Sequence, residues 1–363
     1  MDISDPGPVA EIDLAALSDN ARHLASLAPA ATFAPVVKAN AYGLGDQAVV
    51  EALSTRMGAR TYFTAYANEA APLAEAFPQH TFYILNGFLP AENRHYDAGD
   101  LRPVLNTAAQ AKAWQRTHDG KKPAGLAIDI GMNRLGFRLE DAVALAQTAT
   151  ISAQSIRLVV MHLSHGSTPG APENAAALTR YGEAREALTP LYPQAAFSLS
   201  ASAALFLEDG AEEALIRPGI ALYGGAPDGD PGHALKPVVT LTAPLIAIRT
   251  VEPGETVGYN GRWRATDRTQ IGILGIGYAD GYPRSLTNRG HVMLGDKECP
   301  VLGAISMDLT AIDLTNAHDA QEGDRAELFG PKRLIDAVAA DAGTIAYELL
   351  TSMGPRVQRI YRG

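Results

Sequence analysis

The sequence has almost no cysteine, no excess of positive charge and no signal for export. Its 363 residues include a single cysteine, Cys299, so neither an internal disulfide nor a cysteine-based metal cluster can form. Such scarcity is typical of proteins in a reducing, cytoplasmic setting. The formal net charge of -10 argues against nucleic acid or an anionic membrane as a partner, because both attract basic surfaces.

The chain also lacks long apolar segments. Its first residues, MDISDPGPVAEIDL, carry acids and prolines where a signal peptide has basic residues followed by an apolar run. Nowhere do about eighteen apolar residues follow one another, which is the length that a membrane-spanning helix needs. We therefore predict a cytoplasmic protein with no membrane partner.

What the sequence does contain is the composition of an ordinary globular protein, with 47% hydrophobic and 19% charged residues. Short β-rich runs alternate with helix-like patterns, a rhythm that implies parallel strands joined by right-handed crossovers. This rhythm predicts an α/β fold, a (β/α)8 barrel of the TIM type, with a doubly wound open sheet as the alternative. The eight strand candidates are residues 32–38, 61–66, 81–85, 102–105, 125–129, 157–163, 196–199 and 216–223.

The pattern changes after residue 224. Residues 226–237, APDGDPGHALKP, have the composition of a linker. Strand candidates follow, among them residues 291–294, 310–313 and 325–329, and turn pairs such as Gly295-Asp296 and Gly323-Asp324 separate several of them. Two short helical patterns come near the end of the chain. We predict a barrel domain over residues 9–233 and an all-β, strand-rich C-terminal domain over residues 234–363, with residues 1–14 pairing with the latter.

Lys38 stands at the end of the first strand candidate, in PVVKANAYGLG. Active sites of such barrels lie at the carboxyl ends of the strands, and a partly desolvated lysine amine there is a nucleophile toward carbonyl groups. The simpler interpretation is a strand-end lysine that reaches solvent. Four other polar side chains occupy equivalent positions on later strands, which favours a shared site: Arg134, His162, Ser202 and Arg217.

Two of these positions suggest a phosphate site. Ser202 begins the helix-like run SAALFL, so its hydroxyl would either help to bind a phosphate or simply cap the helix. Arg217 precedes Pro218 and Gly219 in a part of the chain where barrels often bind phosphate, and a glycine permits close backbone approach.

Other patterns are not supported by the sequence. Gly275 and Gly277 lack the third glycine of a dinucleotide fingerprint. His162 and His165 have no accompanying carboxylate or cysteine pattern, so we predict no metal site. No G-x-S-x-G sequence occurs, which leaves a serine hydrolase unsupported.

Nine stretches along nearly the whole chain carry recognisable motifs. They are AEIDLAAL at 10–17, VVKANAYGLG at 36–45, DIGMNRLGF at 129–137, SASAAL at 200–205, RPGIALYG at 217–224, VGYNGRW at 257–263, GIGYADGY at 275–282, SMDL at 306–309 and AYELL at 346–350. Together these stretches resemble the alanine racemases, which are fold-type III pyridoxal-phosphate enzymes. The lysine motif, R-P-G-I-x-L-Y-G and G-Y-A-D-G are in combination highly specific.

This resemblance implies a set of roles. Lys38 would bind pyridoxal 5'-phosphate covalently and exchange the α-proton on the D face of alanine. Tyr259, reaching in from the second subunit, would exchange it on the L face, because racemisation needs proton carriers on opposite faces of one carbon. Without the resemblance, Tyr259 would be interpreted as a packed strand aromatic. The residues implied around the cofactor are Tyr42, His162, Ser202, Arg217, Gly219, Ile220 and Tyr347. Those implied around the substrate are Arg134, Met307, Asp308 and Tyr278.

A site completed across subunits implies a homodimer arranged head to tail. Two positions depart from the family pattern. Many relatives carry a carbamate-modified lysine where this chain has Ala127, so Arg134 must be held in another way, by an anion or by Asn133. Ala201 stands where many relatives have asparagine, which leaves the contacts of His162 open.

The predicted function is pyridoxal-phosphate-dependent interconversion of L-alanine and D-alanine, which supplies D-alanine for peptidoglycan. Alternatives are a racemase of the same fold with broader substrates such as serine, and a non-catalytic pyridoxal-phosphate-binding protein, which would resemble the barrel alone. A decarboxylase of the same fold is disfavoured, because Arg217 against the pyridine nitrogen would weaken the ring as an electron sink.

Overall fold

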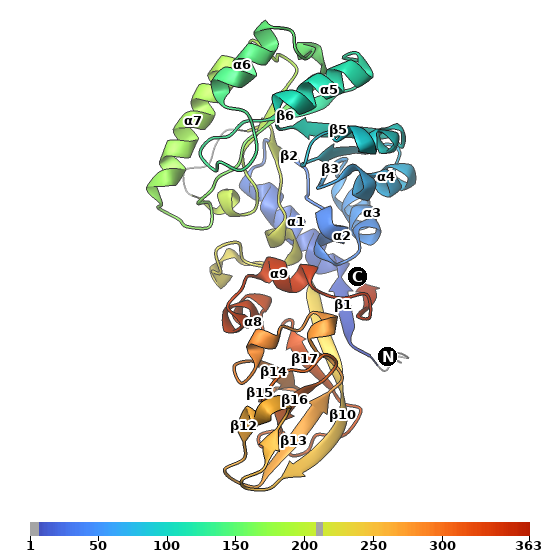
Figure 1. Ribbon diagram of the computed structural model, residues 1–363, viewed down its shortest axis with the longest axis vertical. Coiled ribbons are helices and arrows are strands. Elements are labelled where there is room, and N and C mark those ends of the chain that lie inside the picture. Colours follow the sequence, from blue (N-terminus) through green and yellow to red (C-terminus); the bar gives the residue numbers. More distant parts are fainter. Residues whose placement is uncertain (1–6, 208–212) are drawn as a thin grey trace. The chain divides into compact units, whose positions relative to one another are not determined.

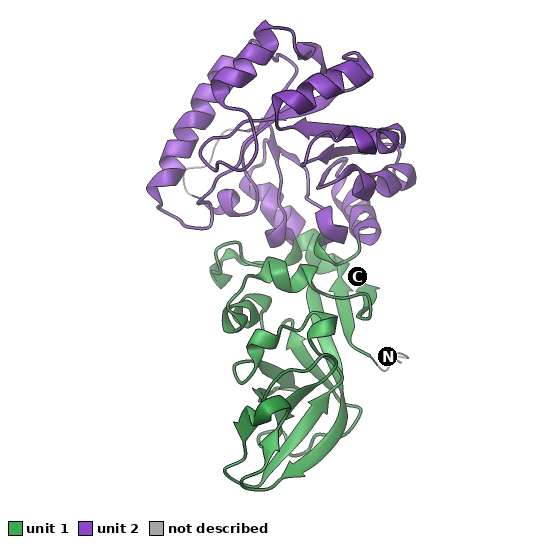
Figure 2. Ribbon diagram, viewed as in Figure 1, with its two compact units in different colours: residues 1–19, 42–45, 223–363 green, residues 20–41, 46–222 purple. Residues whose placement is uncertain are grey.

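A computed structural model of the chain describes residues 7–207 and 213–363. The chain forms two compact units (Figure 2). The first, here called the α/β unit, comprises Asn20–Ala41 and Asp46–Leu222. The second, the β unit, comprises Met1–Asp19, Tyr42–Gly45 and Tyr223–Gly363. Residues 1–6, which belong to the segment predicted to pair with the C-terminal domain, lie outside the described residues.

The α/β unit contains short parallel strands that alternate with helices, as the sequence rhythm predicts. Six strands pair in chain order, and two more form a separate parallel pair. The six are β3 (Thr61–Thr64), β4 (Thr81–Ile84), β5 (Asp100–Leu105), β6 (Ala124–Ala127), β7 (Ile156–Val160) and β8 (Ala196–Ser198), and the pair is β2 (Thr32–Phe33) with β9 (Leu215–Ile216). Single bridges join Val36 to Phe63 and Ala201 to Arg217.

The helices of this unit lie on the outside of its strands (Figure 1). They pack through one apolar side, as α4 does with its alanines and Leu73. They are α3 (Asp46–Met57), α4 (Ala67–Ala76), α5 (Ala108–His118), α6 (Leu139–Gln147) and α7 (Pro172–Leu188), with α1 (Leu14–Leu27) before them and the 3-10 turns η1 (Pro90–Asp97), η2 (Ala153–Ser155), η3 (Ala203–Phe206) and η4 (Ile220–Tyr223) between them.

The β unit is built on one eight-stranded sheet, in the order β13-β16-β15-β14-β17-β10-β1-β18. β13 also pairs with β10, which closes a ring of six strands. The strands are β1 (Val9–Asp13), β10 (Val239–Val251), β13 (Thr269–Leu274), β14 (His291–Leu294), β15 (Lys297–Leu302), β16 (Thr310–Asp313), β17 (Arg325–Phe329) and β18 (Gln358–Arg362). Smaller elements are the hairpin β11 (Thr256–Val257) with β12 (Trp263–Arg264), the helices α8 (Ile335–Ala342) and α9 (Ala346–Thr351), and the turns η5 (Pro231–His233), η6 (Tyr259–Gly261), η7 (Tyr278–Asp280) and η8 (Arg284–Leu286).

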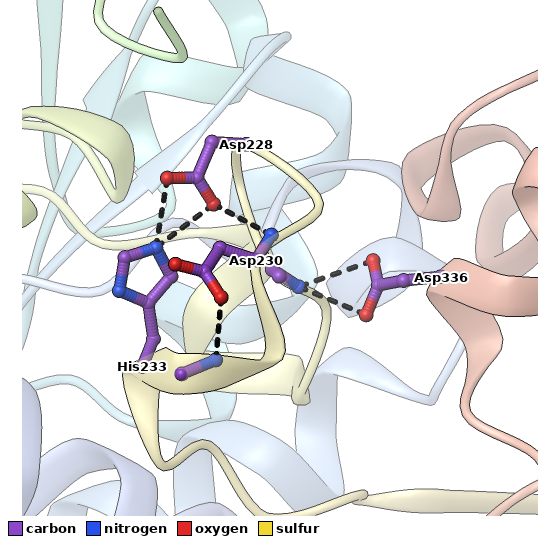
Figure 3. A network of polar contacts seen from close by, with 6 residues as sticks. Asp228, Asp230, His233 and Asp336 are labelled. Carbon is purple, nitrogen blue, oxygen red and sulfur yellow. Dashed lines mark hydrogen bonds and ion pairs between the residues drawn. The ribbon is translucent and has the colours of Figure 1, made fainter. Parts of the chain in front are cut away.

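The segment with linker composition, residues 226–237, is ordered by carboxylates (Figure 3). Asp228 accepts a hydrogen bond from the imidazole Nε2 of His233 at 2.8 Å. Asp336 of α8 accepts from the backbone N–H of Ala226 at 3.2 Å. The composition of this segment, rich in Gly, Pro and Asp, alone indicates a flexible connection. Hydrogen bonds to carboxylate side chains nevertheless hold it in a defined conformation.

None of the helices in the described part of the chain combines the length and the apolar character needed to cross a lipid bilayer.

Candidate active site

Lys38 lies immediately after a stretch of backbone that is fixed from both sides. The Val36 N–H donates to the carbonyl of Pro218 at 2.9 Å, and the Val37 N–H donates to the carbonyl of Phe63 at 2.8 Å. The regular strand predicted over residues 32–38 is shorter, since only β2 forms a continuous ladder. The chain leaves Lys38 through the five-residue turn α2 (Lys38–Tyr42).

The turn α2 is left-handed. Its φ angles lie between 51° and 57° from Ala39 to Tyr42. This conformation costs roughly 1–2 kcal/mol per residue for L-amino acids, because Cβ crowds the following carbonyl oxygen. The lysine is thus presented by a strained backbone that its surroundings must stabilise.

The environment of Lys38 favours a neutral amine. Burial lowers the pKa of its ammonium group, and the positive charge of Arg134 lowers it further. The Glu69 carboxylate acts in the opposite direction and raises that pKa. A neutral lysine amine is the form that attacks a carbonyl carbon or accepts a proton.

Arg217 is a buried cation at the end of β9, with 3% of its surface exposed. Its Nη2 donates to the carbonyls of Met161 at 2.8 Å and Leu199 at 3.2 Å, and its Nη1 donates to the hydroxyl of Ser198. The guanidinium carbon lies 5.9 Å from the centre of the Phe63 ring. Burial lowers the pKa of Arg217 to about 10, so the side chain is still charged at neutral pH.

Ser202 does not cap the following 3-10 turn, because its side chain makes no capping hydrogen bond there. Its buried hydroxyl oxygen instead accepts from the N–H groups of Gly219 at 2.9 Å and Ala221 at 3.2 Å. Both acceptor positions of the hydroxyl are then used, and its proton remains to be donated. The N–H of Ile220, between the two donors, bonds to no described residue. Two unused donors next to one another suit an anionic group such as phosphate.

His162 is held in its neutral form. Burial, the largest cause, and the positive charges of Arg217, Arg134 and Lys38 together lower the pKa of its imidazole to about 3. The charges of Arg217, Arg134 and Lys38 act on His162, so these four side chains lie in one neighbourhood of the α/β unit. They are four of the five residues predicted from the strand ends.

The neutral state of His162 gives a testable pH dependence in the cofactor-free protein. Between pH 6.5 and about 3 the unfolded imidazole binds a proton that the folded one does not. Acidification therefore favours unfolding in this window, and the free energy of unfolding falls by up to about 1.4 kcal/mol per pH unit. His162→Gln should remove this loss, so urea titrations at pH 7, 6 and 5 should show the variant gaining stability relative to wild type. The same substitution at exposed His318 is the control, and parallel curves for His162→Gln and wild type would contradict the assignment.

Arg134 is presented by a tight loop over residues 129–137. The Asp129 carboxylate accepts hydrogen bonds from the backbone N–H groups of Gly131, Met132 and Asn133 at 2.9 to 3.1 Å. The guanidinium of Arg134 is exposed and makes no hydrogen bond to the residues that the structure describes, including the side chain of Asn133. It is available to bind a carboxylate through two parallel N–H groups.

Several candidates of the β unit are exposed. Tyr259 is 68% exposed, Met307 is 53% exposed and Tyr278 is 44% exposed. Tyr278 and Met307 lie on adjoining loops, because the Tyr278 N–H donates to the carbonyl of Ser306 at 3.1 Å. A Cβ atom at Gly277 would lie 2.3 Å from the carbonyl oxygens of Ser306 and Met307, so this approach requires glycine. The Met307 N–H donates to no residue of the described ranges.

Tyr42 and Tyr347 belong to one aromatic cluster of the β unit. The ring centre of Tyr42 lies 4.7 Å from that of Tyr223 and 6.1 Å from that of Tyr347. Burial raises the pKa of the Tyr347 phenol to about 12 and raises that of Tyr42 as well. Both phenols therefore keep their protons at neutral pH and are hydrogen-bond donors.

The chain is similar to known proteins along nearly its whole length. The chain matches the families described as "Alanine racemase, N-terminal domain" over residues 12–227 and "Alanine racemase, C-terminal domain" over residues 238–361. It is 42% identical to the alanine racemase of Acidiphilium cryptum (strain JF-5), with 99% of this chain and 97% of that relative covered. This chain belongs to the alanine racemase family.

Further relatives agree with this membership. The catabolic alanine racemase of Agrobacterium fabrum is 38% identical, over 96% of this chain and 91% of its own length. Among solved structures, the alanine racemase from Bartonella henselae with covalently bound pyridoxal phosphate is similar with a TM-score of 0.90 at 33% identity, covering 99% of this chain and 100% of that one.

Sequence reasoning missed two residues that contact candidate residues or their immediate neighbours. Glu69 accepts hydrogen bonds from Ala39 next to Lys38 and from the start of α4. A glutamate three residues after a helix N-cap is the signal that was available for it. Arg356 follows a glycine and a proline near the end of the chain, and no spacing rule marks it.

Arg356 joins the two exposed loops of the β unit. Its Nη1 donates to the carboxylate of Asp308 at 2.8 Å, and its Nε donates to the buried carboxylate of Asp280 at 3.0 Å. Asp280 also accepts from the N–H of Gly277 at 3.0 Å. The arginine therefore fixes the loop of Met307 relative to the turn that carries Tyr278.

Replacing Arg356 with glutamine should loosen the Met307 loop and weaken substrate binding. We expect the KM for alanine to rise about 10-fold, the cost of one lost charge-assisted contact to the loop, with a smaller change in kcat. Steady-state racemisation kinetics measure both. Arg289→Gln is the matched control, since that exposed side chain bonds to none of the described residues. An unchanged KM for Arg356→Gln would show that the loop does not depend on this contact.

Proposed function

We propose that this member of the alanine racemase family interconverts L-alanine and D-alanine with pyridoxal 5'-phosphate, using Lys38 and Tyr259 as proton carriers on opposite faces of the α-carbon. The observation that carries the proposal is the Lys38 amine. It lies in one charged neighbourhood with Arg134, and burial and that arginine both lower its pKa. Membership of the family, together with a crystallised relative that holds pyridoxal phosphate covalently, supports the choice of cofactor.

The donors of the chain fit the anionic end of this cofactor. In the α/β unit, the Ser202 hydroxyl proton and the Ile220 N–H have no acceptor among the described residues, and Gly219 keeps Ser202 in place through its N–H. We assign Tyr42 and Tyr347 to the same phosphate group, because buried protonated phenols are good donors to an anion.

Arg217 and His162 are assigned to the surroundings of the cofactor ring. When bound, pyridoxal phosphate draws electrons from the α-carbon of an amino acid and so acidifies its α-proton. Arg217 is charged and only donates hydrogen bonds, so it would keep a pyridine nitrogen unprotonated. A weak electron sink suits a carbanion that is reprotonated at once, as racemisation requires, and neutral His162 adds no further charge.

Arg134 and the Met307 N–H are assigned to the carboxylate of alanine. The exposed guanidinium supplies a charge-assisted pair of bonds, and the free amide supplies one more. Asp308 supports the Met307 loop through Arg356, and Tyr278 lines the entrance for the substrate.

Each base handles one enantiomer. The Lys38 amine accepts the α-proton of D-alanine, and the Tyr259 hydroxyl returns a proton to the opposite face; the reverse reaction exchanges their roles. Tyr259 is 68% exposed within one chain, which supports a homodimer in which it serves the site of the other subunit.

We also propose a more specific fold than the division into two compact units. Bridges from Val36 to Phe63 and from Ala201 to Arg217 connect the β2–β9 pair to both edges of the six-stranded sheet. These contacts support a closed (β/α)8 barrel that binds the cofactor over residues 9–233, followed by the β-rich domain over residues 234–363. The family match over residues 238–361 favours an enzyme over a cofactor-binding protein that has the barrel alone.

The proposal is tested by incubating the purified protein with pyridoxal phosphate and pure L-alanine and separating the enantiomers by chiral chromatography. Mirror-image molecules have equal free energies, so the expected end point is an equal mixture from either enantiomer. Parallel reactions with serine, lysine and arginine test broader specificity. A role in supplying D-alanine for peptidoglycan would be supported by D-alanine auxotrophy of a deletion strain. Absence of D-alanine in the assay would contradict the proposed function.

A further inference from the structure

The left-handed turn after Lys38 is an unusual feature of the α/β unit. Ala39, Asn40 and Ala41 have φ angles of 54°, 56° and 51°, although none of them is glycine. Such a run persists only where neighbouring groups stabilise it, and strain of this kind collects at functional sites. The contacts that hold the turn therefore also fix the start of the Lys38 side chain.

Local and long-range hydrogen bonds hold the turn. The Ala41 N–H donates to the carbonyl of Val37 at 2.9 Å, which closes the turn itself. The Asp46 N–H donates to the side-chain oxygen of Asn40 at 3.0 Å. The Ala39 N–H donates to Oε1 of Glu69 at 3.1 Å. The first two bonds are local in the sequence, whereas the third comes from a helix that follows the next strand.

The second carboxylate oxygen of Glu69 is anchored elsewhere. Oε2 accepts from the Ala65 N–H at 2.8 Å and from the Tyr66 N–H at 3.3 Å, at the point where β3 ends and α4 begins. One carboxylate thus bridges the loops that follow β2 and β3. Both of its oxygens accept from backbone N–H groups, which fixes the orientation of the carboxylate.

We propose that Glu69 is a positioning residue for the reaction: its carboxylate clamps the left-handed turn to the start of α4 and so holds the Lys38 amine in line with the D face of the substrate. The inference rests on the proposed function of Lys38. Proton transfer requires donor and acceptor within hydrogen-bond reach, so a turn that relaxes toward right-handed backbone would move the amine away. Charges that act on Lys38 besides Glu69 come from Arg134, with His162 and Arg217 nearby.

Three variants separate the clamp from its charge. Glu69→Gln keeps the size of the side chain but removes the charge. Its amide NH2 group would face a backbone N–H, and two donors cannot form a hydrogen bond. Glu69→Asp keeps the charge but is one methylene too short to reach both loops. Glu75→Gln makes the same charge change on an exposed position of α4 that bonds to no described residue, and is the matched control.

The first readout is amide hydrogen exchange in the cofactor-free protein, followed by mass spectrometry on peptides covering residues 37–42. We expect exchange to be about 10-fold faster in Glu69→Gln and in Glu69→Asp, because the Ala39 N–H loses its acceptor and the turn opens more often. Exchange of this segment should stay at the wild-type rate in Glu75→Gln. Exchange of the peptides that contain β4 to β8 should stay at the wild-type rate in all variants.

The second readout is catalytic. We expect kcat to fall about 10-fold in both Glu69 variants, and kcat/KM to fall equally for both enantiomers because their equilibrium constant is one. The isotope effect distinguishes the two faces. With α-deuterated D-alanine it should rise, because the Lys38 step has become slower, whereas with α-deuterated L-alanine it should fall, because removal of that α-proton at Tyr259 then limits the rate less.

Unchanged exchange over residues 37–42 in Glu69→Gln would overturn the clamp. Faster exchange with unchanged kinetics would overturn the positioning role. Wild-type kinetics in Glu69→Asp together with slow catalysis in Glu69→Gln would assign the effect to charge alone, which also overturns the proposal. If exchange over residues 37–42 is faster in the Glu69 variants than in the wild type, but the wild-type protein does not racemise alanine, the proposed function fails. The structural part of the inference then stands.

Discussion

Replacing Lys38 with alanine should lower kcat/KM for alanine racemisation by about 10⁴-fold or more. The variant loses both the amine that joins the cofactor and the proton carrier of the D face, and general acid-base catalysis alone contributes about 10²- to 10⁴-fold. The amine is suited to both tasks, because burial lowers its pKa and increases the neutral fraction. Chiral chromatography of D-alanine formed from L-alanine measures the loss.

Two controls separate chemistry from folding in this experiment. Lys112→Ala removes an exposed lysine from α5 and should leave the rate unchanged. Added methylamine should restore part of the activity of Lys38→Ala, since a small free amine can occupy the space left by the side chain. A Lys38→Ala protein that racemises at more than about one tenth of the wild-type rate would remove the lysine from its assigned role.

Replacing Tyr259 with phenylalanine should strongly slow inversion but leave the proton exchange of one enantiomer. Racemisation should fall by about 10²- to 10⁴-fold, the usual contribution of one positioned acid or base. D-alanine should still exchange its α-proton for solvent deuterium with retention, because Lys38 can remove and return a proton on the same face. L-alanine should exchange little. Tyr278→Phe, the same change at another exposed tyrosine, should affect exchange from both enantiomers alike.

Mixing the two inactive variants tests whether Tyr259 serves the other subunit. A heterodimer of Lys38→Ala and Tyr259→Phe chains would contain one site with both residues intact and one site with neither. Co-refolded or co-expressed chains should therefore recover activity in proportion to the heterodimer formed. Equal exchange of L-alanine and D-alanine by Tyr259→Phe, or no recovery in verified heterodimers, would contradict the assignment of Tyr259.

Much of the architecture is predictable from sequence periodicity. Strand candidates such as residues 291–294, 310–313 and 325–329 match β14, β16 and β17, because their turn pairs set their ends. The candidate at 32–38 is longer than β2, since apolar residues continue into backbone that makes only single bridges. Side-chain contacts that order residues 226–237 join positions far apart in the chain, and composition carries no information about them.

The prediction of the family is confirmed by the matches over residues 12–227 and 238–361. The roles of individual site residues stay predictions. The structure adds the backbone conformations and the long-range hydrogen bonds that sequence motifs do not reveal. The Lys38 motif does not reveal that Ala39 to Tyr42 form a left-handed turn, because alanine has no preference for that conformation. Ser202 has the sequence signature of a helix cap, yet its oxygen accepts from a loop that follows another strand. Such long-range polar contacts depend on three-dimensional closure and not on local spacing.

The most direct test of the central claim is incorporation of deuterium by wild-type protein and Lys38→Ala, each supplied with pyridoxal phosphate and L-alanine in heavy water. We predict that D-alanine formed by the wild type carries deuterium at its α-carbon, and that label and inversion are both lost in the variant. D-alanine formed without label from solvent would contradict proton exchange at Lys38, and label appearing at the wild-type rate in Lys38→Ala would assign the chemistry to another residue.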